Sequence, residues 1–514
     1  MCGGHACQGS VPLGLLFGLL YRCRLRTLLP ILLAVLALVA GNPTSAAEQP
    51  ATRLDDRFGI AESLANPNAM AELGAGWTRV LLAWHHIQSS NPTDYWGFGR
   101  VLRENVLDQE VARGVKVAGV VQYTPPWAAT DPSHGHRAVP RNLYLPYDDP
   151  DNYFGQFVYQ TVRRYAGRID EWIIWNEPDF LSTDPGVGES YTWMGSEEDF
   201  VQLLRVGYLA VKRANPQARV SFPATSYWAD AVMSRPQYYE RILDLLSRDP
   251  NAAEHNLYHD AVSVNLYRKP DDLYRVYSVF KDIQARHGLD RPLWLTETNA
   301  MPSDDGSVPC AERHTHDPWQ TTQQEQAAFA VQAMAMASAA GYEHIGWWRL
   351  IDGRPCIQAR LWGAVRDDGS WRPAAIALRT AIGLFSGFSR AQFVPLARER
   401  GLWPANDFEP NWRVYQVAFD RPRGQRVTAV WNADADPLSI GVVANGSTAR
   451  AFTIDGGAAD ITYRDGAWLV HLPAATASFA GDSPGYHYIG GAPVLVVEEG
   501  VDPSAPVVPP ALVP

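Results

Sequence analysis

Two glutamates, Glu177 and Glu297, stand directly after short apolar runs that are typical of buried strands. Glu177 ends the stretch EWIIWNE at 171–177, and Glu297 ends the stretch RPLWLTE at 291–297. Glutamate is disfavoured in strands. Its occurrence at the end of two expected strands therefore indicates that these carboxyl groups have a functional role. Two carboxyl groups across a cleft can divide the work of bond cleavage. One gives a proton to a leaving oxygen, and the other attacks the carbon that the oxygen leaves.

The elements that would position these glutamates are strands and helices that alternate from about residue 57 to residue 387. Eight short apolar runs can be counted, and most of them lead through a loop into an amphipathic helical pattern. Such alternation predicts an α/β fold with a parallel sheet, closed most simply as a (β/α)8 TIM barrel. An open doubly wound sheet is the alternative, but the stretch FGIAESLANP after the first strand lacks the expected glycine-rich phosphate loop.

The spacing of the two glutamates fits the barrel. Glu177 ends the expected fourth strand, and Glu297 ends the expected seventh strand 120 residues later, which is three units of about 40 residues. In a parallel barrel the functional groups lie at the carboxyl ends of the strands, and strands four and seven lie across the mouth from each other. Retaining glycoside hydrolysis needs two carboxyl groups placed in this way, roughly 5–5.5 Å apart.

The pattern of strands and turns in the sequence differs outside this region. The barrel is expected at 52–388, and short strands with Gly and Asp-Gly turns predict a small antiparallel β-sandwich at 389–500. The proline-rich tail at 501–514 is expected to be unpacked.

Residues 1–46 predict export. Three arginines precede an apolar run at 28–40, and small residues suited to cleavage follow it near 46–47. A second apolar run lies at 11–21, and neither run reaches the roughly 20 residues of a membrane span. We expect a protein that is secreted, periplasmic or held facing outward by an uncleaved N-terminal anchor.

The cysteines and histidines raise the question of a disulfide or a metal. Cys310 and Cys356 are the cysteines that follow residue 46, and export favours one disulfide between them, which would join the loops after strands seven and eight. Zinc is the rival, because Cys310, His314, His316 and Cys356 could supply ligands, as could the pair His134 and His136. A metal-dependent barrel hydrolase would place His-x-His at a strand end, so we expect no metal and no cofactor.

Composition narrows the choice of partner. The net charge of −11 argues against nucleic-acid binding. The 18 Trp and 22 Tyr residues indicate either a large core or flat platforms on which sugar rings stack. We expect a monomer that binds a polysaccharide or oligosaccharide. Two other functions stay open: a non-catalytic carbohydrate-binding protein on the same scaffold, and a metal-dependent barrel hydrolase.

The stretches IIWNEPD and WLTETN resemble the signatures of a clan of glycoside hydrolases with (β/α)8 barrels and catalytic glutamates on strands four and seven. Within that clan the chain is most similar to family 39, which includes bacterial exopolysaccharide hydrolases and β-xylosidases. The resemblance implies that Glu177 is the general acid/base and Glu297 the nucleophile. It also implies hydrolysis of O-glycosidic bonds in a β-linked extracellular glycan by double displacement.

The resemblance implies roles for further residues. Asn176 matches the asparagine that hydrogen-bonds the sugar 2-hydroxyl, Arg79 the arginine that keeps the nucleophile ionised, and Tyr267 the tyrosine that hydrogen-bonds it. Three more positions would contact substrate: Asn265, where the family often has histidine; Trp127 of YTPPWA, at the border of the cleft; and Trp348, or else Trp347, as the sugar platform.

Overall fold

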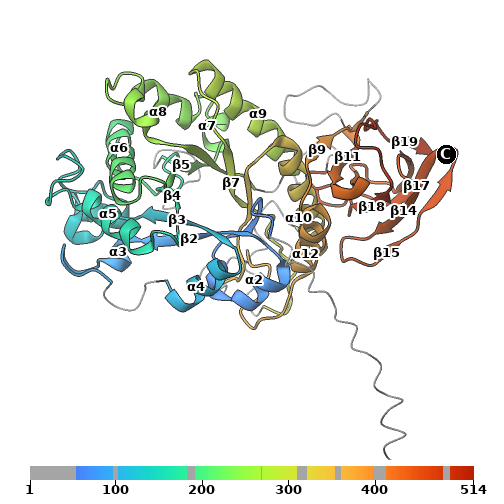
Figure 1. Ribbon diagram of the computed structural model, residues 1–514, viewed down its shortest axis with the longest axis horizontal. Coiled ribbons are helices and arrows are strands. Elements are labelled where there is room, and N and C mark those ends of the chain that lie inside the picture. Colours follow the sequence, from blue (N-terminus) through green and yellow to red (C-terminus); the bar gives the residue numbers. More distant parts are fainter. Residues whose placement is uncertain are drawn as a thin grey trace, which may run out of the picture. The chain divides into compact units, whose positions relative to one another are not determined.

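The computed structural model describes residues 54–96, 102–181, 192–267, 269–308, 321–353, 361–398, 412–478 and 487–513. Eight parallel strands close into a barrel in the order β1 to β8, which confirms the predicted fold class (Figure 1). The strands are β1 (Phe58–Ile60), β2 (Trp77–Ala83), β3 (Lys116–Gln122), β4 (Glu171–Ile174), β5 (Arg219–Thr225), β6 (Ala261–Asn265), β7 (Leu293–Thr298) and β8 (His344–Trp347).

Helices cover the outside of the barrel. They are α2 (Pro67–Leu73), α3 (Trp84–Ile87), α4 (Glu104–Ala112), α5 (Tyr153–Tyr165), α6 (Glu197–Ala214), α7 (Trp228–Val232), α8 (Tyr238–Leu246), α9 (Pro270–Arg286), α10 (Gln323–Ala340) and α12 (Pro373–Phe385). The sequence reading had no helix between the fifth and sixth strands, where α7 and α8 lie. Within the described ranges, no helix is long and apolar enough to cross a membrane.

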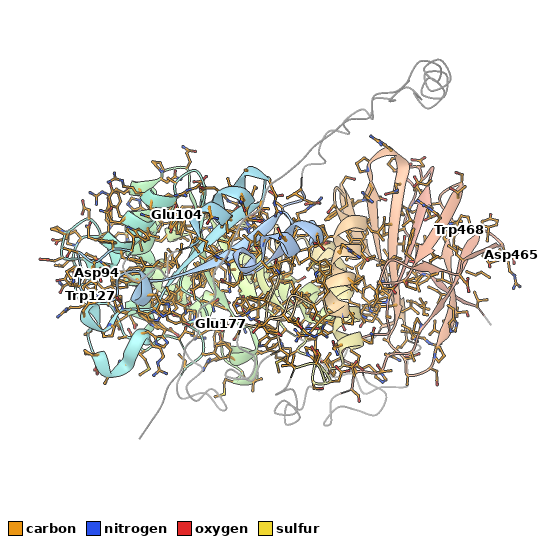
Figure 2. All side chains as sticks on the ribbon, turned by 90° about the horizontal axis from the view of Figure 1, so that it is seen from below. Asp94, Glu104, Trp127, Glu177, Asp465 and Trp468 are labelled. Carbon is orange, nitrogen blue, oxygen red and sulfur yellow. The ribbon has the colours of Figure 1, made fainter. Side chains whose placement is uncertain are left out.

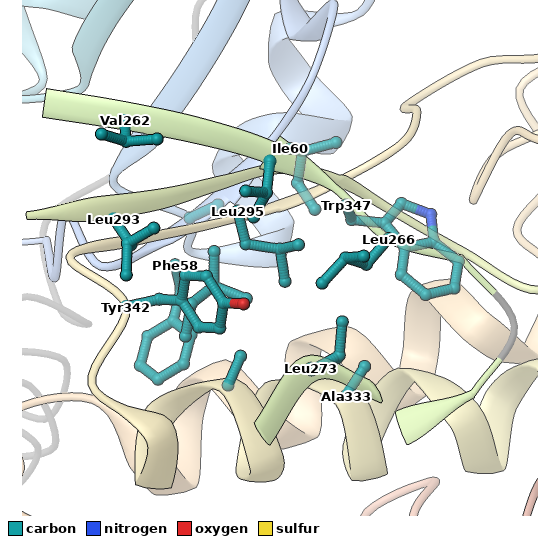
Figure 3. Close-up of a cluster of buried hydrophobic side chains, with 14 of the residues drawn as sticks. Phe58, Ile60, Val262, Leu266, Leu273, Leu293, Leu295, Ala333, Tyr342 and Trp347 are labelled. Atoms are coloured by element: carbon teal, nitrogen blue, oxygen red, sulfur yellow. The ribbon is translucent and has the colours of Figure 1, made fainter. Parts of the chain in front are cut away.

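The apolar core lies between the barrel and its helices. In Figure 3, Leu293 and Leu295 of β7 point toward the helices that carry Leu273 and Ala333. Residues two apart in a strand share a face, so this alternation directs the intervening Trp294 into the barrel. There Trp294 packs with Val120, Ile173 and Ala261 from three other strands.

A polar layer closes the amino-terminal end of the barrel interior. Trp77 donates from Nε1 to Oε2 of Glu171 over 3.1 Å, and His344 lies 3.2 Å from the same carboxylate. Trp77 needs room beside β1, and Gly59 provides it, because a Cβ atom on Gly59 would lie 2.4 Å from the Trp77 ring. Because side chains fill the amino-terminal end of the barrel, a functional site is expected at the other end, where the carboxyl termini of the strands lie.

Two antiparallel sheets follow the barrel. Their strands are β9 (Arg390–Phe393), β10 (Leu396–Ala397), β11 (Trp412–Arg421), β12 (Gln425–Asn432), β13 (Leu438–Val443), β14 (Thr448–Phe452), β15 (Ala458–Ala459), β16 (Thr462–Arg464), β17 (Ala467–Leu472), β18 (Val494–Glu499) and β19 (Ala511–Val513). One sheet has the order β10-β11-β12-β18-β14-β15 with β9 beside β11, and the other has the order β16-β17-β13-β19. Side chains from both sheets bury a shared apolar core, as in a sandwich.

The end of the chain differs from its prediction. The tail at 501–514 was expected to be unpacked, but β19 pairs antiparallel with β13, with Leu512 opposite Ile440. Backbone pairing to an edge strand needs few apolar side chains, which explains why composition gave no sign of it.

Candidate active site

A cavity of about 440 Å³ opens at the carboxyl ends of the barrel strands. Its walls contain residues of β2, β3 and β7 and residues that follow β1, β3, β4, β6 and β8, and both Glu177 and Glu297 are among them. Figure 2 shows Glu177 on the barrel part of the molecule. The structure therefore brings the two sequence-predicted carboxyl groups into one cavity.

Glu297 is paired with a cation. Its Oε1 lies 2.6 Å from Nη2 of Arg79, and its Oε2 accepts a hydrogen bond from the hydroxyl of Tyr267. Glu297 and Arg79 are 5% and 4% exposed, so this ion pair is shielded from solvent. The ion pair and the hydrogen bond together fix the position of the Glu297 carboxyl group.

Irregular strand pairing turns Glu297 toward the cavity. Strict alternation after the inward-facing Trp294 would point Glu297 away from the barrel interior. However, the register of β7 shifts against β6 between Val264 and Asn265, and against β8 between Leu295 and Thr298. Such irregularities re-aim side chains at strand ends, and here they direct the carboxyl group into the cavity.

Glu177 is held by a different set of neighbours. Its backbone N–H donates to the carbonyl of Ala224 over 2.8 Å, and its Oε1 accepts from Nδ2 of Asn265 over 2.9 Å. Burial, followed by the charges of Glu297 and Asp179, raises the pKa of Glu177 to about 8. The hydrogen bond from Asn265 and the charge of Arg79 act in the opposite direction but are outweighed.

The segment that carries Glu177 has an unusual backbone. β4 ends at Ile174, after which Trp175 and Glu177 have φ of 73° and 50°, in the left-handed region. The hydroxyl oxygen of Thr192 lies 2.6 Å from the carbonyl oxygen of Asn176 and 2.9 Å from that of Glu177. Strained backbone of this kind persists where the surroundings fix it and concentrates at functional sites.

A hydrogen-bond network joins the two carboxyl groups. Oδ1 of Asn176 accepts from Nη1 of Arg79 over 3.5 Å and from Nδ2 of Asn265 over 3.2 Å. Since Arg79 pairs with Glu297 and Asn265 bonds Glu177, the network runs from one glutamate to the other. Asn265 was expected to contact substrate. It is 2% exposed and is not part of the cavity wall, so it contacts Glu177 instead.

Two tryptophans form aromatic walls of the cavity. Trp348 is one, and the guanidinium carbon of Arg79 lies 4.8 Å from the centre of its ring. Trp362 is the other, with its ring centre 5.2 Å from that of Tyr267. Trp347, the alternative to Trp348, is fully buried in the core outside the cavity.

Trp127 does not border the cavity, contrary to its prediction. Its ring packs edge-on against Trp84 and Tyr153, and its Nε1 donates to the carbonyl of Gln88 over 2.8 Å. In Figure 2 it lies well away from Glu177. The strand-three motif continues into a short helical turn at Pro126–Ala128, which carries the Trp127 ring toward this outer cluster.

The predicted disulfide falls on residues that the structure does not describe. Cys310 and Cys356 lie outside the described ranges, as do His314 and His316, so the disulfide and its zinc rival both stay predictions. In the part of the chain that is described, no group of three or more His, Cys, Asp or Glu side chains is arranged to hold a metal ion.

Glu62, Tyr123 and Trp362 are among the residues of the cavity wall that sequence reasoning missed. Glu62 stands two residues after β1, and Tyr123 directly follows β3, so the strand-end rule that selected Glu177 could have selected both. Trp362 lies beyond β8 in a loop, where no pattern in the sequence predicts which way a side chain points.

Several glycoside hydrolases of solved structure resemble this chain in fold. A family 39 glycoside hydrolase from the gut symbiont Bacteroides cellulosilyticus WH2 matches with a TM-score of 0.59 and 16% identity, over 88% of this chain and 82% of that chain. The chain shares its fold with this glycoside hydrolase. The catalytic domain of GH30 xylanase C from Talaromyces cellulolyticus matches with a TM-score of 0.53 and 14% identity, over 86% and 96% of the two chains.

A third similar structure is an endo-β1,6-glucanase, with a TM-score of 0.52 and 14% identity over 87% of this chain and 92% of that chain. No protein-family model matches the sequence, and no curated protein does. At these identities the likeness concerns the fold, which is shared by enzymes that act on different glycans.

Proposed function

We propose that the protein is a retaining glycoside hydrolase that cleaves a β-linked polysaccharide or oligosaccharide outside the cytoplasm. The observation that carries this proposal is the contrast between two glutamates in one cavity. Glu297 is paired with Arg79 at 2.6 Å, whereas the pKa of Glu177 is raised to about 8. A carboxyl group whose pKa lies above neutral and a second one held by a cation are what an acid and a nucleophile require.

In the first step Glu177, in its neutral form, donates its proton to the glycosidic oxygen. The carboxylate of Glu297 attacks the anomeric carbon, the bond from that carbon to the oxygen breaks, and the leaving sugar departs as an alcohol. A covalent glycosyl-enzyme ester remains on Glu297. Arg79 and Tyr267 hold the attacking carboxylate in place through the ion pair and the hydrogen bond described above.

In the second step Glu177, now ionised, takes a proton from a water molecule. The resulting hydroxide attacks the anomeric carbon, the ester bond to Glu297 breaks, and both glutamates return to their starting states. Two inversions at one carbon leave its configuration unchanged.

The remaining residues fit sugar binding. Within the described ranges, the hydrogen bonds of the Asn176 side chain reach its Oδ1, so its amide N–H groups could meet the sugar 2-hydroxyl, as the family resemblance implies. Trp348 and Trp362 offer flat faces for a sugar ring. Export, through a cleaved leader or an N-terminal anchor, is part of the proposal, because it would place the site among extracellular glycans.

A glycan panel tests the proposed function. The mature protein is incubated with β-linked polysaccharides and oligosaccharides, and products are sized by mass spectrometry beside the variants Glu177→Gln and Glu297→Gln. We expect turnover of at least one glycan and a loss of about 10²-fold or more in each variant. Full activity in either variant would contradict the assigned roles, and binding without turnover would favour a non-catalytic carbohydrate-binding protein.

A further inference from the structure

A third carboxyl group, that of Glu62, lines the same cavity and has no part in the mechanism above. Glu62 follows β1, and its N–H donates to the carbonyl of Arg79 over 2.8 Å. β1 pairs with β2, which carries Arg79, and with β8, which leads to Trp348. Glu62 therefore lies between β2, whose Arg79 pairs with the nucleophile Glu297, and β8, which precedes Trp348.

The backbone at Glu62 is strained in the same way as at the catalytic segment. Its φ and ψ are 58° and 34°, in the left-handed region that favours glycine. Tyr123 and Glu177, two other residues of the cavity wall, have φ of 74° and 50°. Non-glycine residues in this region concentrate at functional sites, where the side chain is needed in a direction that the relaxed backbone would not give.

One oxygen of the Glu62 carboxyl group lacks a partner, although the backbone N–H of Leu81 hydrogen-bonds to the group. Its Oε1 is buried, and no hydrogen-bond donor of the described protein reaches it. The nearby cations are engaged elsewhere, since Arg79 pairs with Glu297 and Arg349 donates to the carbonyl of Ile351 over 2.6 Å. Burial raises the pKa of Glu62, against the effect of the charges of Arg79 and Arg349. A buried acceptor without a donor is unfavourable, and a ligand hydroxyl would satisfy it.

The position of Glu62 indicates which sugar it would meet. The charge of Glu297 acts on Glu62, and Arg79 is a neighbour of both. Glu62 is thus on the nucleophile's side of the cavity, where the sugar that receives the attack must lie. Of the charged residues that line the described cavity, Arg79 is the one cation, and Glu297 neutralises it. A sugar with its own carboxylate would bring a further negative charge to a wall whose one lining cation is already paired.

We propose that Glu62 selects the sugar that Glu297 attacks, by accepting hydrogen bonds from its hydroxyl groups and excluding uronic acids from that position. The substrate class is then a glycan cleaved at a neutral sugar. A carboxylate has two oxygens and can accept from two neighbouring hydroxyls of one ring. This proposal rests on the proposed function, because it assigns Glu62 to the sugar that is attacked.

The first test identifies the sugar at the cleaved bond. Wild-type protein digests a panel of neutral and uronic-acid glycans, and the new reducing ends are labelled by borodeuteride reduction and assigned by mass spectrometry. We expect neutral sugars at the new reducing ends. Turnover with a uronic acid at that end would overturn the role of Glu62 and leave the proposed function standing. No turnover of any glycan would contradict the proposed function, and this proposal with it.

The second test uses Glu62→Gln on the best neutral substrate, with Glu72→Gln, an exposed glutamate of α2, as the matched control. Hydrogen bonds to a charged group are stronger than neutral ones, so we expect kcat/KM to fall about 10- to 100-fold in Glu62→Gln and to stay unchanged in Glu72→Gln. The activity on uronic-acid glycans relative to neutral ones should rise in Glu62→Gln. Wild-type kinetics in Glu62→Gln would overturn the proposal.

A third measurement separates contact with the sugar from a purely structural role. 4-Nitrophenyl glycosides of the same sugar that lack a single hydroxyl are compared in the wild-type protein and in Glu62→Gln. Removing the hydroxyl that donates a hydrogen bond to Glu62 should lower kcat/KM markedly in the wild type and much less in the variant. Equal losses in both proteins at every hydroxyl would overturn the proposal.

Discussion

Glu177 and Glu297 have the same side chain, and the residues around them make their chemistry different. Glu297 faces a guanidinium and a tyrosine hydroxyl, whereas Glu177 is half-buried, faces the charge of Glu297 and accepts a hydrogen bond from the uncharged Asn265. The sequence located both carboxyl groups, because each follows a short apolar run. It could not give the state of either group, which depends on neighbours up to 218 residues away, as with Arg79 and Glu297.

We predict that the alkaline limb of the kcat/KM profile has an apparent pKa near 8. Glu177 must carry its proton to act as the acid, and its pKa is raised to about 8, so activity is lost as the pH rises through that value. Initial rates from pH 4 to 10 on a substrate from the panel would measure the limb. Because the Asn265 hydrogen bond lowers the pKa of Glu177, Asn265→Leu should move the limb to higher pH. A limb near pH 4.5, as for an ordinary glutamate, would contradict this account.

At the scale of elements, strand–helix alternation was sufficient to predict the barrel, because each strand and most helices bury a periodic apolar face. The helix α8 was missed although Tyr238, Tyr239, Ile242, Leu243 and Leu246 are all buried at helical spacing. The register shifts that aim Glu297 into the cavity have no signature in the sequence. Elements follow from local periodicity, but the last residues of each strand follow from pairing with neighbours that are distant in the chain.

Close packing inside the barrel gives a prediction for β3. A Cβ atom on Gly119 would lie 2.7 Å from Cζ3 of Trp172, whose side chain is fully buried. Gly119→Ala should therefore lower the free energy of unfolding by about 1–3 kcal/mol, measured by urea denaturation.

The matched control for this substitution is Gly383→Ala in α12, where nothing lies within 4 Å of the added Cβ atom. Alanine is favoured over glycine in a helix, so this variant should be more stable than the wild type by about 0.5–1 kcal/mol. Equal effects of the two substitutions would contradict the packing described for β3.

At the scale of the whole molecule, the C-terminal sheets contact the barrel helices through apolar side chains, such as Phe419 of β11 stacked on Phe385 of α12, and through polar groups. Nε2 of Gln332 in α10 donates to the carbonyls of Gly490 and Gly491 over 2.9 and 3.0 Å, and Tyr415 of β11 donates to Oδ2 of Asp271 in α9 over 2.7 Å. Composition predicted that two architectures follow each other along the chain. It could not predict these contacts, because a single Gln or Tyr on an element surface carries no sign of its partner.

The contact at Asp271 predicts a pH-dependent stability. Burial first, and then the charge of Asp272, raises the pKa of Asp271 to about 7, above the ordinary value of 3.8. A raised pKa means that the fold favours the neutral form, so this contribution is complete below pH 3.8 and is lost as the pH rises through about 7. Asp271→Asn cannot ionise. Its melting temperature relative to that of the wild type should therefore increase from pH 4 to pH 8, and a constant difference would contradict this.

The central claim, that Glu297 forms a covalent intermediate which Glu177 helps to make and break, is tested most directly by the configuration of the first product. A β-linked substrate from the panel is hydrolysed in an NMR tube, and the anomeric proton signals of the new reducing end are followed before mutarotation mixes the two anomers. Double displacement predicts that the β anomer forms first. If the α anomer forms first, hydrolysis proceeds by a single displacement, and the roles assigned here to Glu297 and Glu177 are wrong.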